Sequence, residues 1–235
     1  YILIGWRALH LFNFVDIQAK KCVADLHDII KPSQLTPQII KRTDVFFVKS
    51  KYHASMLKDV PKEKIVVLSN GGYVPYTETE KDKNYLIYSS SYDRGIAYIL
   101  KWAWPKIKQA CPDAYLKIFY GWDGFDATLP KTNDIKLYKD TIVELMKQDG
   151  VMECGRISQQ ELLKEKAKAN IHLYTGDFQE IDCISIRESA GLKVIPVVSK
   201  YQHVFEEKMY CQCIEGNPLT QEMQERVAEV VIRLI

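Results

Sequence analysis

Short apolar runs alternate with amphipathic stretches along nearly the whole chain. Residues 45–48, 85–88 and 194–198 are continuously rather than alternately apolar, a pattern typical of strands buried on both faces of a parallel sheet. The stretches between such runs carry apolar positions at helical spacing. The pattern therefore predicts an α/β fold, with helices covering both faces of parallel sheets.

Turn residues and helix-start signals divide the chain into elements. Strands are expected at residues 1–6, 21–26, 45–49, 65–68, 85–88, 115–120, 151–154, 171–174 and 194–198. Helices are expected at residues 8–17, 36–42, 51–58, 96–110, 138–147, 159–169, 182–190 and 221–234. Residues 121–134 are expected to be rich in loops.

A polar segment at 73–83, with Pro75 and a run of Glu, Lys and Asp, interrupts this alternation and is the expected linker. The pattern restarts after it. We therefore predict two Rossmann-like domains, at residues 1–76 and 77–235. Ligands of such folds bind beyond the carboxyl ends of the strands, so residues that directly follow strands are the functional candidates.

The composition narrows the class of protein. With 235 residues, 47% of them hydrophobic and 26% charged, the chain has ordinary globular usage, which excludes disordered and collagen-like classes. A net charge of +2 gives no electrostatic basis for nucleic-acid binding. Six scattered cysteines without a CxxC pair favour free thiols in a cytoplasmic-type compartment over a zinc site. The opening residues lack Met and a basic region, so they are expected to lie inside a longer fold rather than in a signal peptide.

The strongest candidate segment carries two glutamates, Glu180 and Glu188, after the strand expected at 171–174. A helix beginning near residue 182 would offer free N–H groups that suit a phosphate. Glu188 could accept two hydrogen bonds from the hydroxyls of a sugar or ribose. On spacing alone, two solvated charges at a helix start remain the alternative.

Two further candidates also follow strands. In the segment SSSYDRG at 89–95, small residues such as Ser90 allow close backbone approach, and Arg94 could bind a phosphate through two N–H groups. A helix cap beside a surface arginine is the alternative. His27 ends the strand at 21–26 and could hydrogen-bond a substrate hydroxyl or move a proton, the alternative being a histidine that orients its loop.

Taken in order, these segments resemble glycosyltransferase family 4, the retaining nucleotide-sugar glycosyltransferases of the GT-B fold, from about residue 1 to residue 235. The markers are HD at 27–28, DVFFVKS at 44–50, KIVVLSNG at 64–71, YSSSYDRG at 88–95, WPKI at 104–107, PDAYLKIFYGW at 112–122, ECGR at 153–156 and two glutamates at 180 and 188 separated by seven residues. Each marker is weak by itself, whereas their order is specific.

The resemblance implies that residues 77–235 bind a nucleotide-sugar donor and that residues 1–76 belong to the acceptor-side domain. In such enzymes the residue matched by Glu180 faces the transferred sugar, and the one matched by Glu188 binds the ribose. His27 matches a histidine that contacts the donor sugar. The phosphate groups would be held by backbone N–H groups of the donor-binding residues Cys183, Ile184 and Ser185.

The same resemblance assigns the remaining donor contacts. Arg94, in the loop with Ser90, matches the basic residue that neutralises the diphosphate, while Gly155 and Arg156 lie where the nucleobase rests. The sugar would pass, with retention of anomeric configuration, to a glycan, lipid or protein. No metal is expected, because fixed charges and a helix N-terminus would stabilise the leaving nucleoside diphosphate in its place. The nucleotide sugar is the substrate, and no cofactor is expected.

The sequence departs from the family pattern in two places. Ser89 and Ser90 stand where a second basic residue is usual, so phosphate binding would depend more heavily on Arg94. The usual opening strand and glycine-rich loop would precede Tyr1, so the first domain is expected to be incomplete.

Two other functions stay open. One is a non-catalytic GT-B-like module that binds a nucleotide, a glycan or a protein as a scaffold. The other is a nucleotide-sugar epimerase, which would form product without an acceptor. The basic pairs at 20–21 and 41–42 could contact an anionic membrane or be solvated surface charge, so the expected location is cytoplasmic, with peripheral membrane association as the further option.

Overall fold

The computed structural model describes residues 1–14, 17–72, 74, 79–208 and 210–235. The chain divides into two compact units. Unit 1 comprises Tyr1–Gly71 with Gln179–Cys183, and unit 2 comprises Gly72–Phe178 with Ile184–Ile235. The boundary predicted between residues 76 and 77 falls at 75–78, outside the described residues.

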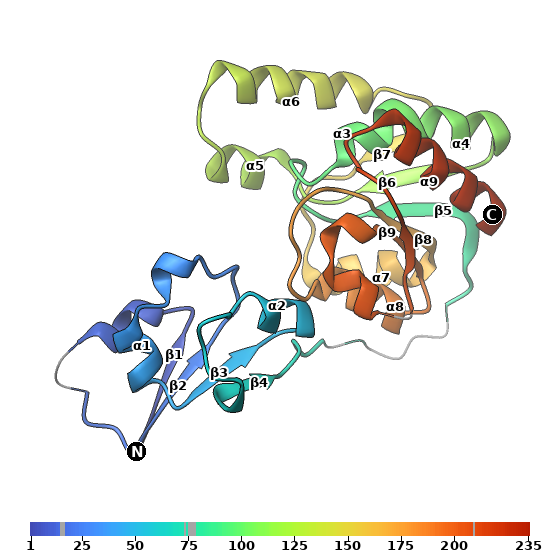
Figure 1. Cartoon of the computed structure of the whole chain (residues 1–235). Helices are drawn as coiled ribbons and strands as arrows, with labels where there is room; N and C mark the ends of the chain where they lie inside the picture. Colours follow the sequence, from blue (N-terminus) through green and yellow to red (C-terminus); the bar gives the residue numbers. More distant parts are fainter. Residues whose placement is uncertain (15–16, 73, 75–78, 209) are drawn as a thin grey trace. The chain divides into compact units, whose positions relative to one another are not determined.

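Unit 1 is built on a four-stranded parallel sheet in the order β1-β2-β3-β4 (Figure 1). Its connections include two short helices, of which the first begins as its Thr-Pro start predicts. Thr36 Oγ1 accepts a hydrogen bond from the Ile39 N–H at 3.3 Å, and Pro37 takes the first helical position. The elements are β1 (Ile2–Trp6), β2 (Lys21–Asp25), α1 (Pro37–Arg42), β3 (Val45–Val48), α2 (Lys51–Ser55) and β4 (Ile65–Val67).

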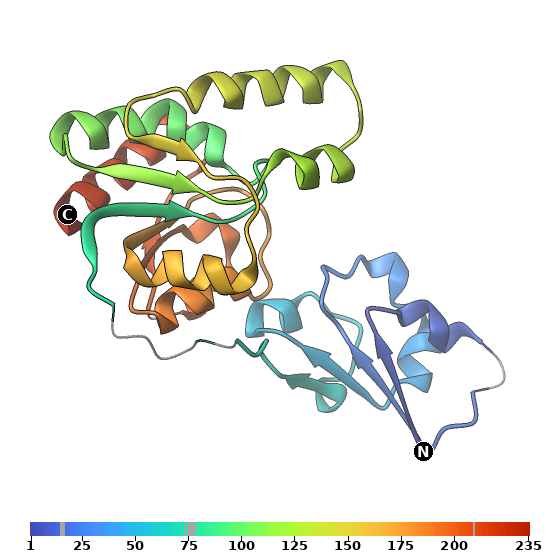
Figure 2. The same ribbon diagram turned by 180° about the vertical axis from the view of Figure 1, so that it is seen from behind.

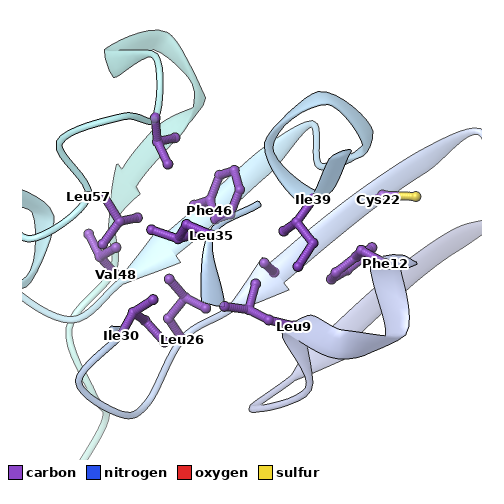
Figure 3. Packing of buried hydrophobic residues seen from close by; sticks show 12 residues of the cluster. Leu9, Phe12, Cys22, Leu26, Ile30, Leu35, Ile39, Phe46, Val48 and Leu57 are labelled. Carbon is purple, nitrogen blue, oxygen red and sulfur yellow. The ribbon is translucent and has the colours of Figure 1, made fainter. Parts of the chain in front are cut away.

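The core of unit 1 packs helical connections against the sheet (Figure 3). The helix predicted at 8–17 is only a 3₁₀ turn over Leu9–Asn13, and residues 15 and 16 lie outside the described ones. A 3₁₀ turn brings positions i and i+3 to one side, so Leu9 and Phe12 are buried together. A Cβ on Gly5 would lie 2.6 Å from the Phe12 ring, so this contact requires glycine in β1.

Unit 2 is built on a six-stranded parallel sheet in the order β10-β9-β8-β5-β6-β7 (Figures 1 and 2). Tyr85, Leu86, Ile87 and Tyr88 of the central strand are all fully buried, as continuous apolar runs predict. The strands are β5 (Asp82–Tyr88), β6 (Tyr115–Ile118), β7 (Val151–Glu153), β8 (Ala169–Tyr174), β9 (Ile195–Ser199) and β10 (Gln212–Ile214), the last of which was not predicted.

Helices cover both faces of this sheet. On one face lie α3 (Ile96–Tyr98), α4 (Trp104–Ala110) and α9 (Gln221–Leu234), and on the other α7 (Gln159–Lys168) and α8 (Ile184–Gly191) (Figures 1 and 2). The helix predicted at 96–110 contains a π-helical segment, Ile99–Ala103, just before Pro105. Proline cannot donate a backbone hydrogen bond, and its ring clashes with the carbonyl four residues earlier, so a locally widened turn accommodates it. Within the described ranges, the helices all fall short of the length and apolar character that a membrane span requires.

One unpredicted helix, α5 (Trp122–Thr128), forms within the segment expected to be rich in loops at 121–134. The helix predicted at 138–147 is α6 (Asn133–Leu145), which begins five residues earlier than predicted. Trp122 packs on Tyr92 with ring centroids 4.5 Å apart, and Phe125 packs on Tyr138 at 6.5 Å. These contacts stabilise a helix whose Gly and Asp content favours a loop, because tertiary packing outweighs local propensity.

Candidate functional site

The direction in which strands are added to the unit 2 sheet reverses between β5 and β8. The chain runs from β5 to β6 and β7 on one side, whereas β8, β9 and β10 lie on the other. In open parallel sheets, ligands bind beyond the carboxyl ends of the strands at such a switch point. The residues that follow β5 and β8, and the start of α8, are therefore the candidate site of unit 2.

Arg94 lies in the loop after β5, together with the half-buried Ser90. Its guanidinium carbon is 3.7 Å from the ring centroid of Phe178, which follows β8. The two loops approach closely because Gly95, at φ +99°, faces Gly176, where an added Cβ on Gly95 would lie only 2.6 Å from the Gly176 Cα. A guanidinium stacked on an aromatic face can still bind a phosphate through its edge, so this placement suits the predicted role.

The two segments predicted to bind phosphate meet directly. Ser89 Oγ, in the loop after β5, is 2.9 Å from Ser185 Oγ in the first turn of α8. Beneath them His172 Nδ1 is 2.7 Å from Ser189 Oγ, while its Nε2 lies 3.4 Å from Ser89 Oγ. Burial, with the nearby ammonium of Lys166, lowers the pKa of His172 well below its usual range, so this histidine is a neutral support for the loop.

Glu188 is buried, with 6% of its surface exposed. Its Oε1 accepts a hydrogen bond from Gln159 Nε2 at 2.7 Å, and its Oε2 accepts one from Lys166 Nζ at 2.8 Å. Glu180 is also buried, at 7% exposed. The alternative of two solvated charges at a helix start is therefore wrong.

The helix itself begins later than predicted. Its first residue is Ile184 rather than Asp182, so Cys183 precedes the helix, while Ile184 and Ser185 form its start. Asp182 is engaged elsewhere within unit 1, since its Oδ2 accepts a hydrogen bond from the Asn70 N–H at 2.6 Å.

Gly155 and Arg156 follow β7 and are tied to the Arg94 loop through one carboxylate. Glu153 Oε1 accepts hydrogen bonds from the Tyr92 hydroxyl at 2.5 Å and from the Gly155 N–H at 3.0 Å. Burial, and then this contact with Glu153, raises the pKa of Tyr92, which keeps its hydroxyl a donor. A Cβ on Gly121 would lie 3.0 Å from the Arg156 nitrogen, so these segments are closely packed.

His27 belongs to unit 1, where it follows β2. Its Nε2 is 3.1 Å from Asp25 Oδ2, and Lys49 Nζ donates to Asp25 Oδ1 at 2.6 Å. Burial alone would raise the pKa of Asp25, but the hydrogen bonds from Lys49 and His27 outweigh it and hold the pKa below its usual range. A cavity of about 200 Å³ is lined in part by His27 with Arg7, His10 and Asp28. Glu180 and Cys183 fall in Gln179–Cys183, which is grouped with this unit.

Sequence reasoning assigned no role to three residues that contact the candidate site of unit 2. Lys166, Gln159 and Glu153 look like ordinary surface charge and polarity along the chain. One signal was available for Lys166, since Leu163, Lys166 and Ala167 follow helical spacing and form the buried stripe of α7. Throughout the part of the chain that the structure describes, groups of three or more His, Cys, Asp or Glu side chains suited to a metal ion are absent.

Comparison with solved structures identifies the two parallel-sheet α/β units as a fold of the GT-B type found in glycosyltransferases. This chain is similar to TarM of S. aureus, with a TM-score of 0.68 and 13% identity over 99% of this chain and 48% of that one. It is also similar to Anabaena Alr3699/HepE in complex with UDP-glucose, with a TM-score of 0.64 and 13% identity over 90% of this chain and 61% of that one.

A third similar structure is the pneumococcal O-GlcNAc transferase GtfA in complex with UDP and GlcNAc, with a TM-score of 0.64 and 12% identity over 91% of this chain and 44% of that one. The chain thus spans between 44% and 61% of the length of these three proteins. Neither the models of protein families nor the curated proteins give a match to the sequence. At these identities the likeness establishes the fold alone.

Proposed function

We propose that this chain is part of a nucleotide-sugar glycosyltransferase and that unit 2 binds the nucleoside diphosphate of the donor. One observation carries the proposal. The Arg94 loop and the Glu188 helix, about ninety residues apart in sequence, meet at the switch point of the sheet, with Ser89 Oγ 2.9 Å from Ser185 Oγ. Ligands of open parallel sheets bind at this place. Two of the similar structures, which are complexes with UDP or UDP-glucose, also support it.

The proposed roles follow from charge and geometry. Arg94 and the N-terminus of α8 would stabilise negative charge that grows on the leaving diphosphate as the glycosidic bond breaks, and so favour the transition state over the ground state. Glu188 would accept hydrogen bonds from the ribose, and Gly155 with Arg156 would border the nucleobase. Glu180 would face the transferred sugar.

His27 of unit 1 would contact the same sugar. We propose transfer with retention of configuration and without a metal ion, to a glycan, lipid or protein acceptor. Peripheral contact with a membrane stays a prediction. Two residues of the basic pairs at 20–21 and 41–42 contact other parts of unit 1. Lys21 pairs with Asp44 at 2.9 Å, and Arg42 donates to the Phe12 carbonyl at 3.1 Å.

Calorimetric titration tests the donor site. UDP, GDP and ADP, and a nucleotide sugar of each, are added to the protein first in EDTA and then in Mg²⁺. We expect one base to bind with equal affinity in both conditions. Binding that requires Mg²⁺ would contradict the metal-free proposal, and absence of binding at millimolar ligand would contradict the donor site.

A second measurement separates the transferase from its alternatives. Product formation from the bound nucleotide sugar is followed with and without candidate acceptors. Product that appears only with an acceptor supports a transferase, whereas a changed nucleotide sugar in its absence indicates an epimerase. Nucleotide binding with neither product indicates a binding module.

A further inference from the structure

Lys166 is the one lysine in the described ranges with no exposed surface. It lies in α7, in a stretch whose other lysines, Lys164 and Lys168, are exposed. Its ammonium donates to Glu188 Oε2 at 2.8 Å, to Ser185 Oγ at 2.9 Å and to the Ser185 carbonyl at 3.0 Å. The ammonium group has three N–H donors, so these three acceptors match its capacity.

These contacts join the parts of the candidate site. Because Lys166 donates to Ser185 Oγ, the Ser185 hydroxyl proton is directed onward, and Ser89 offers acceptors at 2.9 Å (Oγ) and 3.2 Å (carbonyl). The chain of contacts thus runs from α7 through the first turn of α8 to the loop after β5. On its other side the same ammonium fixes the carboxylate of Glu188, whose second oxygen accepts from Gln159 Nε2.

Stability alone does not explain a buried ion pair of this kind. Taking two charges out of water is costly, and well-packed apolar residues in their place are often as stable or more so. The pair instead fixes the position of the Glu188 carboxylate and balances its negative charge. An unpaired Glu188 would repel a diphosphate that approaches the start of α8, whereas the Lys166 ammonium neutralises it at 2.8 Å.

We propose that Lys166 is a positioning residue for the nucleotide, an inference that rests on the proposed donor site. It holds the Glu188 carboxylate in the orientation that receives the ribose. Through Ser185 it holds the Ser89 loop in the arrangement that receives the phosphates. Lys166 itself acts only through these residues and does not touch the ligand.

The test compares Lys166→Met with Lys168→Met, which removes an exposed lysine of the same helix that pairs with Glu165. Dissociation constants are measured for UDP, GDP and ADP and for their nucleosides. We expect Lys166→Met to weaken both the nucleoside and the nucleoside diphosphate that the wild type binds by about tenfold or more, and Lys168→Met to change neither. Equal affinities in the two variants would overturn the proposal.

Because Lys166→Met leaves a carboxylate buried, two further variants guard against a failure to fold. Ser185→Ala removes only the shared hydroxyl, and is expected to weaken the diphosphate more than the nucleoside. Lys166→Met/Glu188→Gln removes both charges, and is expected to bind no more weakly than the weaker of the two single variants, since the residues act as one unit. Additive losses would overturn the linkage between Lys166 and Glu188.

Amide hydrogen exchange without ligand provides a readout that separates this proposal from the donor-site proposal. Positioning predicts faster exchange at residues 89–91 and 184–186 in Lys166→Met, with exchange in β10 unchanged, whereas general destabilisation accelerates both. If the wild type binds no nucleotide but this local effect is present, the donor site fails while the linkage stands. If exchange is accelerated everywhere or nowhere, the positioning role is wrong.

Discussion

Arg94 lies over the ring of Phe178, with 3.7 Å between the guanidinium carbon and the ring centroid. The contact joins the loop after β5 to the segment after β8, the two sides of the switch point in the unit 2 sheet. It fixes the direction of the only cation that sequence reasoning assigned to the diphosphate. An arginine positioned in this way loses less side-chain freedom when it binds a phosphate than a mobile one does.

Arg94→Ala is therefore expected to weaken a nucleoside diphosphate by about ten- to a hundredfold, the scale of a lost charge-assisted hydrogen bond, and its nucleoside by much less. Phe178→Leu keeps the charge but removes the aromatic face, and we expect a smaller loss with the same selectivity. Calorimetry with both ligands measures this. An equal loss for nucleoside and diphosphate would remove Arg94 from the phosphate site.

Substitutions at Gly176 and Gly155 test whether the close approach of the loops after β5 and β8 requires glycine, with Gly155 as the control. A Cβ on Gly176 would collide with the Arg94 carbonyl oxygen, whereas one on Gly155 meets nothing within 4 Å. Gly155→Ala should lower the free energy of unfolding by only about 1–2 kcal/mol, because alanine disfavours the left-handed backbone at this position, φ +68°. Gly176→Ala should cost more and also weaken diphosphate binding. Urea unfolding of both variants compares them, and equal losses would contradict the packing argument.

Most strands of this fold could be predicted from the sequence, since their apolar runs are continuous and end at turn residues. The start of α1 was equally readable, because Thr36 and Pro37 carry a local signal. The helix α5 was not, since it depends on aromatic contacts of Trp122 and Phe125 with residues far along the chain. Such long-range contacts cannot be predicted from the residues of the helix alone.

The candidate site divides in the same way. Arg94 and Glu188 were predicted because their order along the chain matches a known pattern. Lys166 and Gln159 were not, because their contacts with Glu188 arise only when α7 packs beside α8. Spacing alone also did not reveal that Glu188 is buried, and its burial limits which substitutions can test its role.

Glu188→Ala is expected to destabilise the protein by about 3–5 kcal/mol, because it leaves the Lys166 ammonium buried without its carboxylate. A loss of nucleotide binding in that variant would be hard to separate from unfolding. Glu188→Gln keeps the shape and two polar atoms, so we expect a smaller loss of stability and weaker nucleotide binding. Thermal unfolding and calorimetry on both variants distinguish the effects. Unchanged affinity in Glu188→Gln would contradict its ribose role.

His27→Ala is expected to lower the rate of transfer with little change in nucleotide affinity, since His27 belongs to unit 1. Asp25→Asn leaves the ring in place and weakens the 3.1 Å contact that orients the imidazole. It also removes the carboxylate charge that the buried Lys49 ammonium contacts at 2.6 Å, so thermal unfolding of this variant is measured beside its rate. We expect Asp25→Asn to fall between the wild type and His27→Ala in rate. Initial rates at saturating donor measure both, and a fall in nucleotide affinity alone would contradict the proposed role.

His53 predicts how the stability of unit 1 depends on pH. It is fully buried, its Nδ1 accepts a hydrogen bond from the Lys49 N–H at 3.2 Å, and burial lowers the pKa of His53 from 6.5 to about 4. The unfolded chain therefore binds a proton that the folded one does not, so stability rises with pH in this range. The stability that the neutral, buried His53 contributes is fully present above about pH 6.5. It is lost as the pH falls toward 4, which lowers the free energy of unfolding by about 3 kcal/mol in all.

Urea unfolding between pH 7 and pH 4 measures this loss. His53→Gln retains an acceptor for the Lys49 N–H but cannot take up a proton, so we expect its stability to fall less steeply than that of the wild type as the pH is lowered. His10→Gln, a change at an exposed histidine, is the control and should follow the wild type. Because His172 of unit 2 is also buried with a lowered pKa, part of the slope should remain in His53→Gln. Identical slopes in all three proteins would show that burial of His53 does not control acid stability.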